Sequence, residues 1–189
     1  MDREIAYAKI NLALHVRRRR DDGYHDLETL FAFCADGDVL EADELLPGDS
    51  DALAGVGQWG LSRLEVVGQF ADGIGAMADN SVLKAYNWLE PQMAVRFRLT
   101  KNLPVASGIG GGSADAASAL RLIHRLWCGD QHVFHFQTET ATSEWRYADG
   151  ELDIRHAAFP GLGRALGADV PVCVHSQTAR GEGIGEKLT

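Results

Sequence analysis

Residues 103–115 read Leu-Pro-Val-Ala-Ser-Gly-Ile-Gly-Gly-Gly-Ser-Ala-Asp, and this glycine-rich stretch decides the fold. An alternating apolar segment typical of a strand, 93–99, precedes it, and an apolar stripe at helical spacing follows from Ser113. Glycine lets the backbone approach a ligand without a Cβ atom in the way, and the start of a helix offers unpaired N–H groups and a partial positive charge. A strand, a glycine loop and a helix in this order predict a cradle for phosphate groups.

Two common nucleotide-binding motifs do not match this stretch. It lacks the G-x-x-x-x-G-K-[ST] pattern of a Walker A loop, and Gly108-x-Gly110-x-x-Ser113 is one glycine short of the dinucleotide fingerprint. Pro104 also fits poorly in the first strand of a Rossmann unit. A dinucleotide-binding oxidoreductase would need an acidic residue about 20 residues past the glycines, and Asp130 has no convincing strand before it. For Ser113 two interpretations stay open: it caps the helix, or it also contacts a phosphate.

The composition is that of an ordinary globular protein with an acidic balance. The 189 residues carry 18 Lys and Arg against 27 Asp and Glu, a net charge of −9, and 46% are hydrophobic. This charge argues against nucleic-acid binding, which needs a basic footprint, so an anionic ligand requires a local device such as the glycine stretch. No apolar run is long enough to span a membrane, and no secretory signal is visible at the start. The three cysteines form no C-x-x-C pair, and we expect a cytoplasmic protein with reduced cysteines.

The first strand is indicated by strict alternation in residues 5–16. Six apolar residues share one face and predict a buried side: Ala6, Ala8, Ile10, Leu12, Leu14 and Val16. Lys9 and Asn11 lie on the opposite, polar face, about 7 Å apart along the strand. We therefore expect these two side chains to project in the same direction.

Further elements can be placed from shorter patterns. We expect short strands at 27–33, 38–44 and 64–67. A helix follows the N-cap signal at Asn80 and ends before Pro91. Together with the elements beside the glycine stretch, these strands and helices predict a mixed α and β domain.

Two charged or ligating clusters have ordinary explanations. Four arginines, residues 17–20, precede an Asp-Gly turn signal, and the aspartates beside them favour a solvated hairpin tip over an anion site. His132 and His135 have no third ligand nearby at a recognised spacing, so we expect no metal site there.

Four motifs in this order resemble a known kinase family. Pro104-x-x-x-Gly108-Ile-Gly-Gly-Gly-Ser113 resembles the second signature of the galactokinase, homoserine kinase, mevalonate kinase and phosphomevalonate kinase (GHMP) superfamily, and Ala8-Lys-Ile-Asn-Leu resembles its first. With Asp22-Gly-Tyr-His and Leu166-Gly-Ala-Asp-Val-Pro, they are most similar to the branch that acts on 4-diphosphocytidyl-2-C-methyl-D-erythritol in non-mevalonate isoprenoid synthesis. The resemblance covers residues 5–127 and 162–188. It implies an α+β fold, the GHMP-kinase N-terminal domain, with a mixed β-sheet backed by helices and a glycine-rich phosphate loop.

The resemblance implies transfer of the γ-phosphoryl group of ATP to a hydroxyl of the methylerythritol moiety. Asp169 matches the catalytic aspartate of the family, which would orient the hydroxyl and accept its proton. Lys9 matches the catalytic lysine, which would stabilise negative charge on Asp169 and on the incoming oxygen. Without the resemblance, Lys9 would be interpreted as an exposed strand lysine.

The resemblance also implies ATP and Mg²⁺ as cofactors. The residues that would wrap the ATP phosphates are Pro104, Val105, Ala106, Ser107, Gly108, Ile109, Gly110, Gly111, Gly112, Ser113 and Ala114. Asn80 and Lys101 lie where the family contacts the nucleotide. A helix-capping role for Asn80 is compatible with this contact.

A small-molecule substrate is implied by three further matches. Tyr24 and His25 match the pair that holds the cytosine by stacking and by hydrogen bonds, and Asn11 matches a contact to the methylerythritol part. Two alternatives stay open: another GHMP-type kinase, for mevalonate or homoserine, and a non-catalytic nucleotide-binding fragment. Tyr24 with His25, and Asp169 with the Val-Pro that follows it, count against the first alternative. The sequence leaves the oligomeric state open.

The domain organisation departs from the family in two places. The resemblance implies that residues 1–189 form the N-terminal, ATP-binding domain, with an atypical insert at about 128–161, and that the C-terminal GHMP domain is missing. The insert is either a genuine surface insertion or the product of a shifted reading frame. We expect weak or no turnover by these residues alone.

Overall fold

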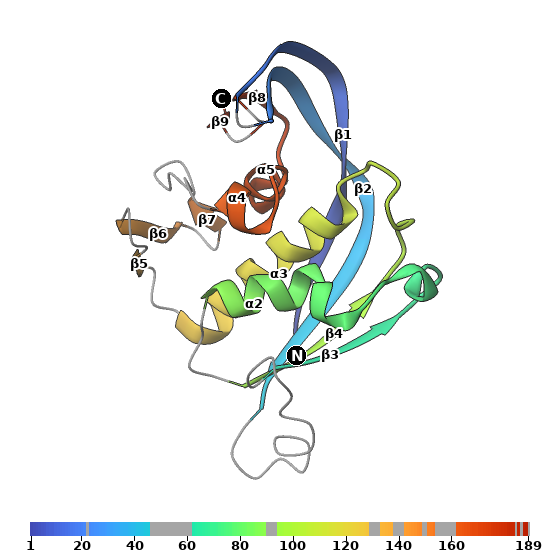
Figure 1. The fold of residues 1–189 in the computed structure, drawn as a ribbon. Helices are drawn as coiled ribbons and strands as arrows, with labels where there is room; N and C mark the ends of the chain where they lie inside the picture. Colours follow the sequence, from blue (N-terminus) through green and yellow to red (C-terminus); the bar gives the residue numbers. More distant parts are fainter. Residues whose placement is uncertain are drawn as a thin grey trace.

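The computed structural model describes residues 1–21, 23–45, 62–89, 94–128, 133–137, 142–148, 151–153, 162–183, 185 and 187–188. Its main sheet is covered on one side by helices (Figure 1). The sheet contains β1 (Asp2–Arg19), β2 (His25–Glu44), β3 (Arg63–Val67), β4 (Val95–Thr100), β8 (Ala179–Gly183) and β9 (Lys187–Leu188). Their order is β3-β4-β2-β8-β9, and β1 also pairs with β2. Strands β3 and β4 run parallel and the other pairs of this sheet run antiparallel, so the expected mixed sheet is confirmed.

The long hairpin of β1 and β2 corrects the expected number of strands. The two short strands expected at 27–33 and 38–44 form one continuous strand, because Gly37 lets β2 pass a register shift against β1. A Cβ atom on Gly37 would lie 2.5 Å from the carbonyl oxygen of Ala6.

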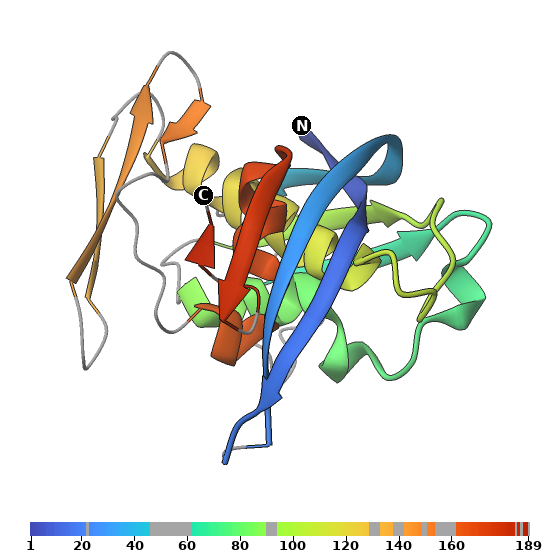
Figure 2. The ribbon, with the colours of Figure 1, turned by 90° about the horizontal axis from the view of Figure 1, so that it is seen from above.

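The apolar face of β1 is buried along only part of its length. Ala6 and Ala8 are buried as expected, but Leu12, Leu14 and Val16 are more than half exposed. This half of the hairpin projects beyond the helices, as Figure 2 shows, so no layer covers it in the described part of the chain. The expected hairpin tip is shorter than the run of arginines suggested, because arginines 17 to 19 belong to β1. The turn begins at Arg20, whose N–H donates to the carbonyl of Tyr24 and whose carbonyl accepts from Gly23. Arginines 17 and 18 are paired with acidic residues on β2.

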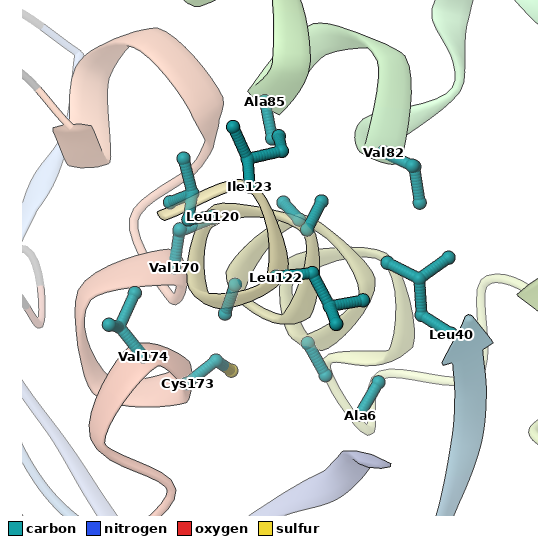
Figure 3. Packing of buried hydrophobic residues seen from close by; sticks show 14 of the residues in the cluster. Ala6, Leu40, Val82, Ala85, Leu120, Leu122, Ile123, Val170, Cys173 and Val174 are labelled. Carbon is teal, nitrogen blue, oxygen red and sulfur yellow. The ribbon is translucent and has the colours of Figure 1, made fainter. Parts of the chain in front are cut away.

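The helical layer is built around α3 (Gly111–Cys128). Its apolar stripe packs between α2 (Ser81–Leu89), α5 (Val170–His175) and the sheet, and Figure 3 shows Leu120 and Ile123 within this core. Two 3-10 turns, Ala71–Gly73 and Met77–Asp79, lead into α2. A short helix, α4 (Leu162–Leu166), precedes α5. This packing fixes the start of α3 and the start of α5 relative to the sheet.

In the expected insert at about 128–161, Cys128 ends helix α3 and the other described residues form strands. They are β5 (Val133–Gln137), β6 (Thr142–Ala148) and β7 (Glu151–Asp153), and they form an antiparallel sheet in the order β5-β6-β7. Figure 2 shows this small sheet beside the helices and apart from the main sheet. His132, Asp130 and Pro91 lie outside the described residues.

Candidate functional site

A buried lysine and a partly exposed aspartate meet at the centre of the domain. Lys9 of β1 donates from its Nζ to Oδ2 of Asp169 at 2.9 Å, across 160 positions of sequence. Asp169 is the N-cap residue of α5, yet its side chain makes no capping hydrogen bond. Its carboxylate is therefore available to Lys9 and, because 37% of its side chain is exposed, to a ligand.

The expected alignment of Lys9 with Asn11 is confirmed. Lys9 Nζ donates to Oδ1 of Asn11 at 3.0 Å, and Nδ2 of Asn11 donates to the hydroxyl of Thr29 at 2.6 Å. The ammonium also lies 5.0 Å from the ring centre of Phe31, within cation–π range. Lys9 is buried rather than exposed, because strand β2 and the start of α5 surround it.

The glycine loop connects β4 to α3 and contacts the lysine directly. The backbone N–H of Lys9 donates to the carbonyl of Ile109 at 2.8 Å. Gly108 and Gly110 have φ values of 77° and 70°, a region that glycine adopts without strain. A Cβ atom on Gly110 would lie 3.1 Å from Cε of Lys9, so the absence of a side chain there permits the close approach. Ala106 adopts a φ of 57° without being glycine, which marks local backbone strain.

Helix α3 begins at Gly111, two residues earlier than expected. The N–H of Ala114 already donates to the carbonyl of Gly110 in the i to i−4 pattern. Ser113 is therefore inside the first turn, and the interpretation of Ser113 as the helix cap is wrong. The first N–H groups of the helix have no intrahelical acceptor by geometry, and they point toward the loop side as an anion site requires.

A second lysine lies beneath the loop in a fully buried cluster. Nζ of Lys101 donates to Oδ2 of Asp115 at 2.8 Å and to Oδ2 of Asp38. Oδ1 of Asp38 accepts from the N–H groups of Asn102 and Leu103, at 2.6 and 2.8 Å. The carboxylate of Asp38 therefore fixes the backbone where the chain enters the glycine loop. Lys101 connects this carboxylate to Asp115 of α3.

The charges of this cluster shift two pKa values. Burial opposes the charge of Lys101, but the carboxylates of Asp115 and Asp38 outweigh it and raise the pKa of Lys101. Burial raises the pKa of Asp115 to about 7; Lys101 acts against this shift, and the charge of Asp38 adds to it. Within the described residues, Oδ1 of Asp115 has no hydrogen-bond partner.

A cavity of about 530 Å³ opens above the loop. Its wall includes most of the residues expected to bind ATP: Asn80, Lys101, Pro104, Val105, Ala106, Ser107, Gly108, Gly110, Gly111, Gly112 and Ser113. Ile109 and Ala114 do not line it, since the carbonyl of Ile109 binds β1 and Ala114 is buried in the core. Asp169 borders the same cavity, so the structure brings the candidate base and the glycine loop together.

Asn80 caps α2, as the sequence predicts. Its Oδ1 accepts from the N–H of Val82 at 2.9 Å, and its carbonyl accepts from the N–H of Lys84 at 3.0 Å. Because Asn80 also lines the cavity, the capping role leaves the nucleotide contact possible.

Tyr24 and His25 lie away from the lysine–aspartate pair. Both are exposed at the tip of the hairpin, where His25 pairs with Arg19. His25 is six residues from Phe31 along β2, which corresponds to about 20 Å in a strand. A single ligand that contacts both ends must therefore extend along the hairpin.

Sequence reasoning assigned no role to Asp38, Asp115 or Thr29. Thr29 falls within the strand expected at 27–33 and Asp38 begins the strand expected at 38–44, but Glu28 precedes Thr29 and Gly37 precedes Asp38, so neither stands out as a polar residue in an apolar run. Asp115 ends the glycine stretch itself. Their partners are distant in the sequence, so no local pattern identifies the contacts.

No group of three or more His, Cys, Asp or Glu in the described part of the chain is arranged to hold a metal ion. Within those residues, no helix combines the length and the apolar character needed to cross a membrane.

Comparison with known proteins identifies a matching family model. The model described as "GHMP kinases N terminal domain" matches residues 80–177, which is more than half of the chain. This range includes Asn80, Lys101, the glycine loop and Asp169.

Individual relatives match nearly the whole chain. Proteins named 4-diphosphocytidyl-2-C-methyl-D-erythritol kinase from Sphingopyxis alaskensis and Erythrobacter litoralis are 43% and 42% identical to it over 98% of its length. The matches cover 55% and 53% of those relatives, so the chain spans about half the length of the curated relatives it matches. The crystal structure of a 4-(cytidine 5'-diphospho)-2C-methyl-D-erythritol kinase aligns with a TM-score of 0.61 and 29% identity, over 100% of this chain and 54% of that one.

Proposed function

Because this chain belongs to the GHMP kinase family, through its N-terminal domain, we propose that it forms the ATP-binding part of a small-molecule kinase and contributes the lysine and aspartate of phosphoryl transfer. The observation that carries the proposal is the ion pair of Lys9 and Asp169 at the wall of the glycine-loop cavity. The resemblance and the α+β fold expected from the sequence agree with this family assignment.

The geometry supports a division of roles. Asp169, exposed to the cavity, orients the acceptor hydroxyl and takes its proton, which is typically worth about 10² to 10⁴ in rate. Lys9 stabilises the negative charge that develops on the attacking oxygen. The loop from Pro104 to Ala114 holds the phosphates on backbone N–H groups, which explains how an acidic protein binds a polyanion.

The cavity fits ATP and its metal ion. Mg²⁺ retains several waters and binds through phosphates and one or two carboxylates, so a dedicated protein cage is unnecessary. Asp79 borders the cavity and has an exposed carboxylate that fits this requirement, which leaves Asp169 for the acceptor hydroxyl. The metal would neutralise charge on the phosphates during transfer.

For the acceptor, we propose 4-diphosphocytidyl-2-C-methyl-D-erythritol, the molecule in the names of the relatives. Asn11 lies beside Lys9 and is suited to hold the methylerythritol part. Tyr24 and His25 would hold the cytosine at the far end of the hairpin, since a cytidine diphosphate ester is an elongated ligand. A cytoplasmic location follows from this biosynthetic role and is part of the same proposal.

The domain assignment belongs to the proposal as well. Residues 1–189 correspond to the N-terminal domain, interrupted by the segment at about 128–161, and the remaining half of the relatives corresponds to the C-terminal domain. The alternative is a nucleotide-binding chain without catalysis, and the transfer experiment below distinguishes it from a kinase.

Binding of ATP tests the proposed site with a matched pair of variants. Gly108 and Gly23 both have positive φ and open space around the missing Cβ atom, but only Gly108 lies in the loop. In Gly108→Asp, a carboxylate repels the phosphates, and we expect ATP affinity measured by calorimetry to fall at least about tenfold. In Gly23→Asp, affinity stays that of the unsubstituted chain. Equal effects of the two substitutions would contradict a phosphate site in the loop.

Phosphoryl transfer separates the candidate activities. The chain is incubated with ATP, Mg²⁺ and one acceptor at a time: 4-diphosphocytidyl-2-C-methyl-D-erythritol, mevalonate or homoserine. Product formed with the first acceptor, followed by ³¹P NMR, supports the proposal, and product with another acceptor supports a different GHMP-type kinase. ATP binding with no transfer to any of them supports the non-catalytic alternative.

A further inference from the structure

The guanidinium of Arg121, on α3, joins the two elements that carry Lys9 and Asp169. Toward β1, its Nε donates to Oε2 of Glu4 at 2.8 Å and its Nη2 donates to the carbonyl of Ile5 at 3.4 Å. Toward α5, its Nη1 donates to the carbonyls of Cys173 and Val174, at 2.9 and 3.1 Å. The remaining bond of Nη2 is to the hydroxyl of Ser118 at 3.1 Å.

These contacts use the whole hydrogen-bonding capacity of the side chain. A guanidinium has five N–H donors, and Arg121 makes five hydrogen bonds. The side chain is only 11% exposed, so it is held within the domain rather than offered to a ligand. A lysine could not reproduce this arrangement, because an ammonium has three donors on a flexible stem and no planar geometry.

The position of α5 depends on contacts of this kind. The helix has only six residues, and Asp169 directly precedes it. The last carbonyls of a helix have no intrahelical partner, and here two of them, on Cys173 and Val174, are bound by Arg121. The same side chain binds β1 at Glu4 and Ile5, only five and four residues before Lys9.

We propose that Arg121 is a positioning residue for the Lys9–Asp169 pair, because it fixes α5 against β1 and thereby sets the separation of the two side chains. Its importance for catalysis rests on the proposed function, in which this pair acts on the acceptor hydroxyl. The positioning itself concerns the contact between Lys9 and Asp169. An error of about 1 Å in the placement of reacting groups can reduce the rate about 10²-fold.

Arg125 of the same helix also donates to the carboxylate of Glu4, and to the carbonyl of Arg3. Both of these partners lie on β1, so Arg125 adds to the attachment of α3 to this strand. The contacts of Arg121 reach α5 as well as β1, and this connection between the two elements is the basis of its positioning role.

The test compares Arg121→Lys with a control, Arg98→Lys, at a half-exposed position on β4. Lysine acetylation by acetic anhydride is followed residue by residue with mass spectrometry. Lys9 and Lys101 are buried and protected, whereas Lys84 is half exposed and serves as the reactive reference. In Arg121→Lys we expect labelling of Lys9 to rise about tenfold relative to Lys84, since loss of the contact with Asp169 opens the site, while Lys101 stays protected. Arg98→Lys should match the unsubstituted chain.

Two results would overturn the proposal. Unchanged protection of Lys9 means that Arg121 does not set the pair, and a joint rise at Lys9 and Lys101 means that the substitution only loosens the domain. Where Arg121→Lys does not fold, Glu4→Gln removes the charged partner on β1 and should raise Lys9 labelling about threefold with Lys101 protected; no rise there is equally contradictory.

Turnover adds a second readout that separates this inference from the proposed function. With the cytidylyl acceptor, Arg121→Lys should lower kcat about 10- to 100-fold and leave the KM for ATP within about twofold, because the glycine loop is untouched. A parallel loss of ATP affinity would count against a positioning role. If the unsubstituted chain transfers no phosphate, the proposed function fails, and the labelling of Lys9 still decides whether Arg121 positions the pair.

Discussion

Two lysines of this domain are equally buried and both donate to carboxylates, but the carboxylates differ. Lys9 and Lys101 are each 3% exposed. The partner of Lys9 is Asp169, whose side chain is 37% exposed at the cavity, whereas the partners of Lys101, Asp38 and Asp115, are 0% and 4% exposed. A general base must reach the proton it removes, so only Asp169 can act on an acceptor directly.

The comparison shows that burial of a lysine does not by itself identify a reacting group. The Lys9 site has one carboxylate, an amide partner and access to the cavity. The Lys101 site has two carboxylates, one of which also holds two backbone N–H groups at the entrance of the loop. We infer that the first site serves chemistry and the second holds the loop in place.

The largest expected effect separates the two sites by activity. Asp169→Asn removes the proton acceptor while keeping the size of the side chain, and kcat should fall about 10²- to 10⁴-fold. Because Asp169→Asn also removes the charged partner of the buried Lys9, the urea midpoint is measured in parallel and kcat is compared under conditions in which the variant is folded. Asp36→Asn, an exposed position on β2, is the matched control and should retain full kcat. A normal kcat of the Asp169→Asn variant would show that Asp169 is not the proton acceptor of the reaction.

The Lys101 site should respond in stability instead. Lys101→Met leaves two buried carboxylates without their cation, and breaking a buried ion pair in this way typically costs about 3 to 5 kcal/mol. The free energy of unfolding from urea titration measures the loss. Lys84→Met, at a half-exposed pair on α2, should change it by less than about 1 kcal/mol. Equal stability of the two variants would contradict a structural role for Lys101.

The sequence predicted the Lys9 site better than the Lys101 site, for a physical reason. Alternation along β1 places Lys9 and Asn11 on one side from local geometry alone, and their hydrogen bond confirms it. Lys101 meets Asp38 across 63 positions of sequence, a contact that depends on how β2 pairs with β4. Strand pairing over such distances leaves no trace in local periodicity.

Two predictions from the sequence were wrong because they also depended on tertiary structure. Alternation predicted that the outer half of β1 is buried, but Leu12 and Leu14 are exposed because the helical layer does not extend that far. Ser113 was a plausible helix cap, yet the glycines before it already adopt helical conformation from Gly111. In both cases the local pattern correctly predicted a strand or a helix. The tertiary arrangement determined which part of the strand is buried and at which residue the helix begins.

The free energy of unfolding should depend on pH because Asp115, a partner of Lys101, changes its protonation state near neutral pH. Burial raises the pKa of Asp115 to about 7, above its ordinary value of 3.8. A raised pKa in the folded state means that this group contributes full stability below about pH 4 and loses it as the pH rises to about 7. The loss from this group should be roughly 2 to 4 kcal/mol, since each pKa unit corresponds to about 1.4 kcal/mol.

Asp115→Asn removes this titration and tests the sign. The free energy of unfolding of the unsubstituted chain minus that of Asp115→Asn should decrease between pH 5 and pH 8. A difference that increases with pH for Asp115→Asn would mean that Asp115 is an ordinary paired carboxylate.

The smallest expected effect is a difference in stability between alanine substitutions at two adjacent glycines, Gly110 beside Lys9 and Gly111 beside Lys101. Gly110 has a φ of 70° and a Cβ atom there would lie 3.1 Å from Cε of Lys9, so Gly110→Ala should destabilise the fold by about 1 to 2 kcal/mol. Gly111 begins α3, and its Cβ atom would lie 3.6 Å from Nζ of Lys101, an ordinary contact. Gly111→Ala should be neutral or stabilising by up to about 1 kcal/mol, because alanine is favoured in a helix. Urea midpoints of the two variants measure the contrast, and equal destabilisation would show that the loop tolerates no side chain at either site rather than a specific approach to Lys9.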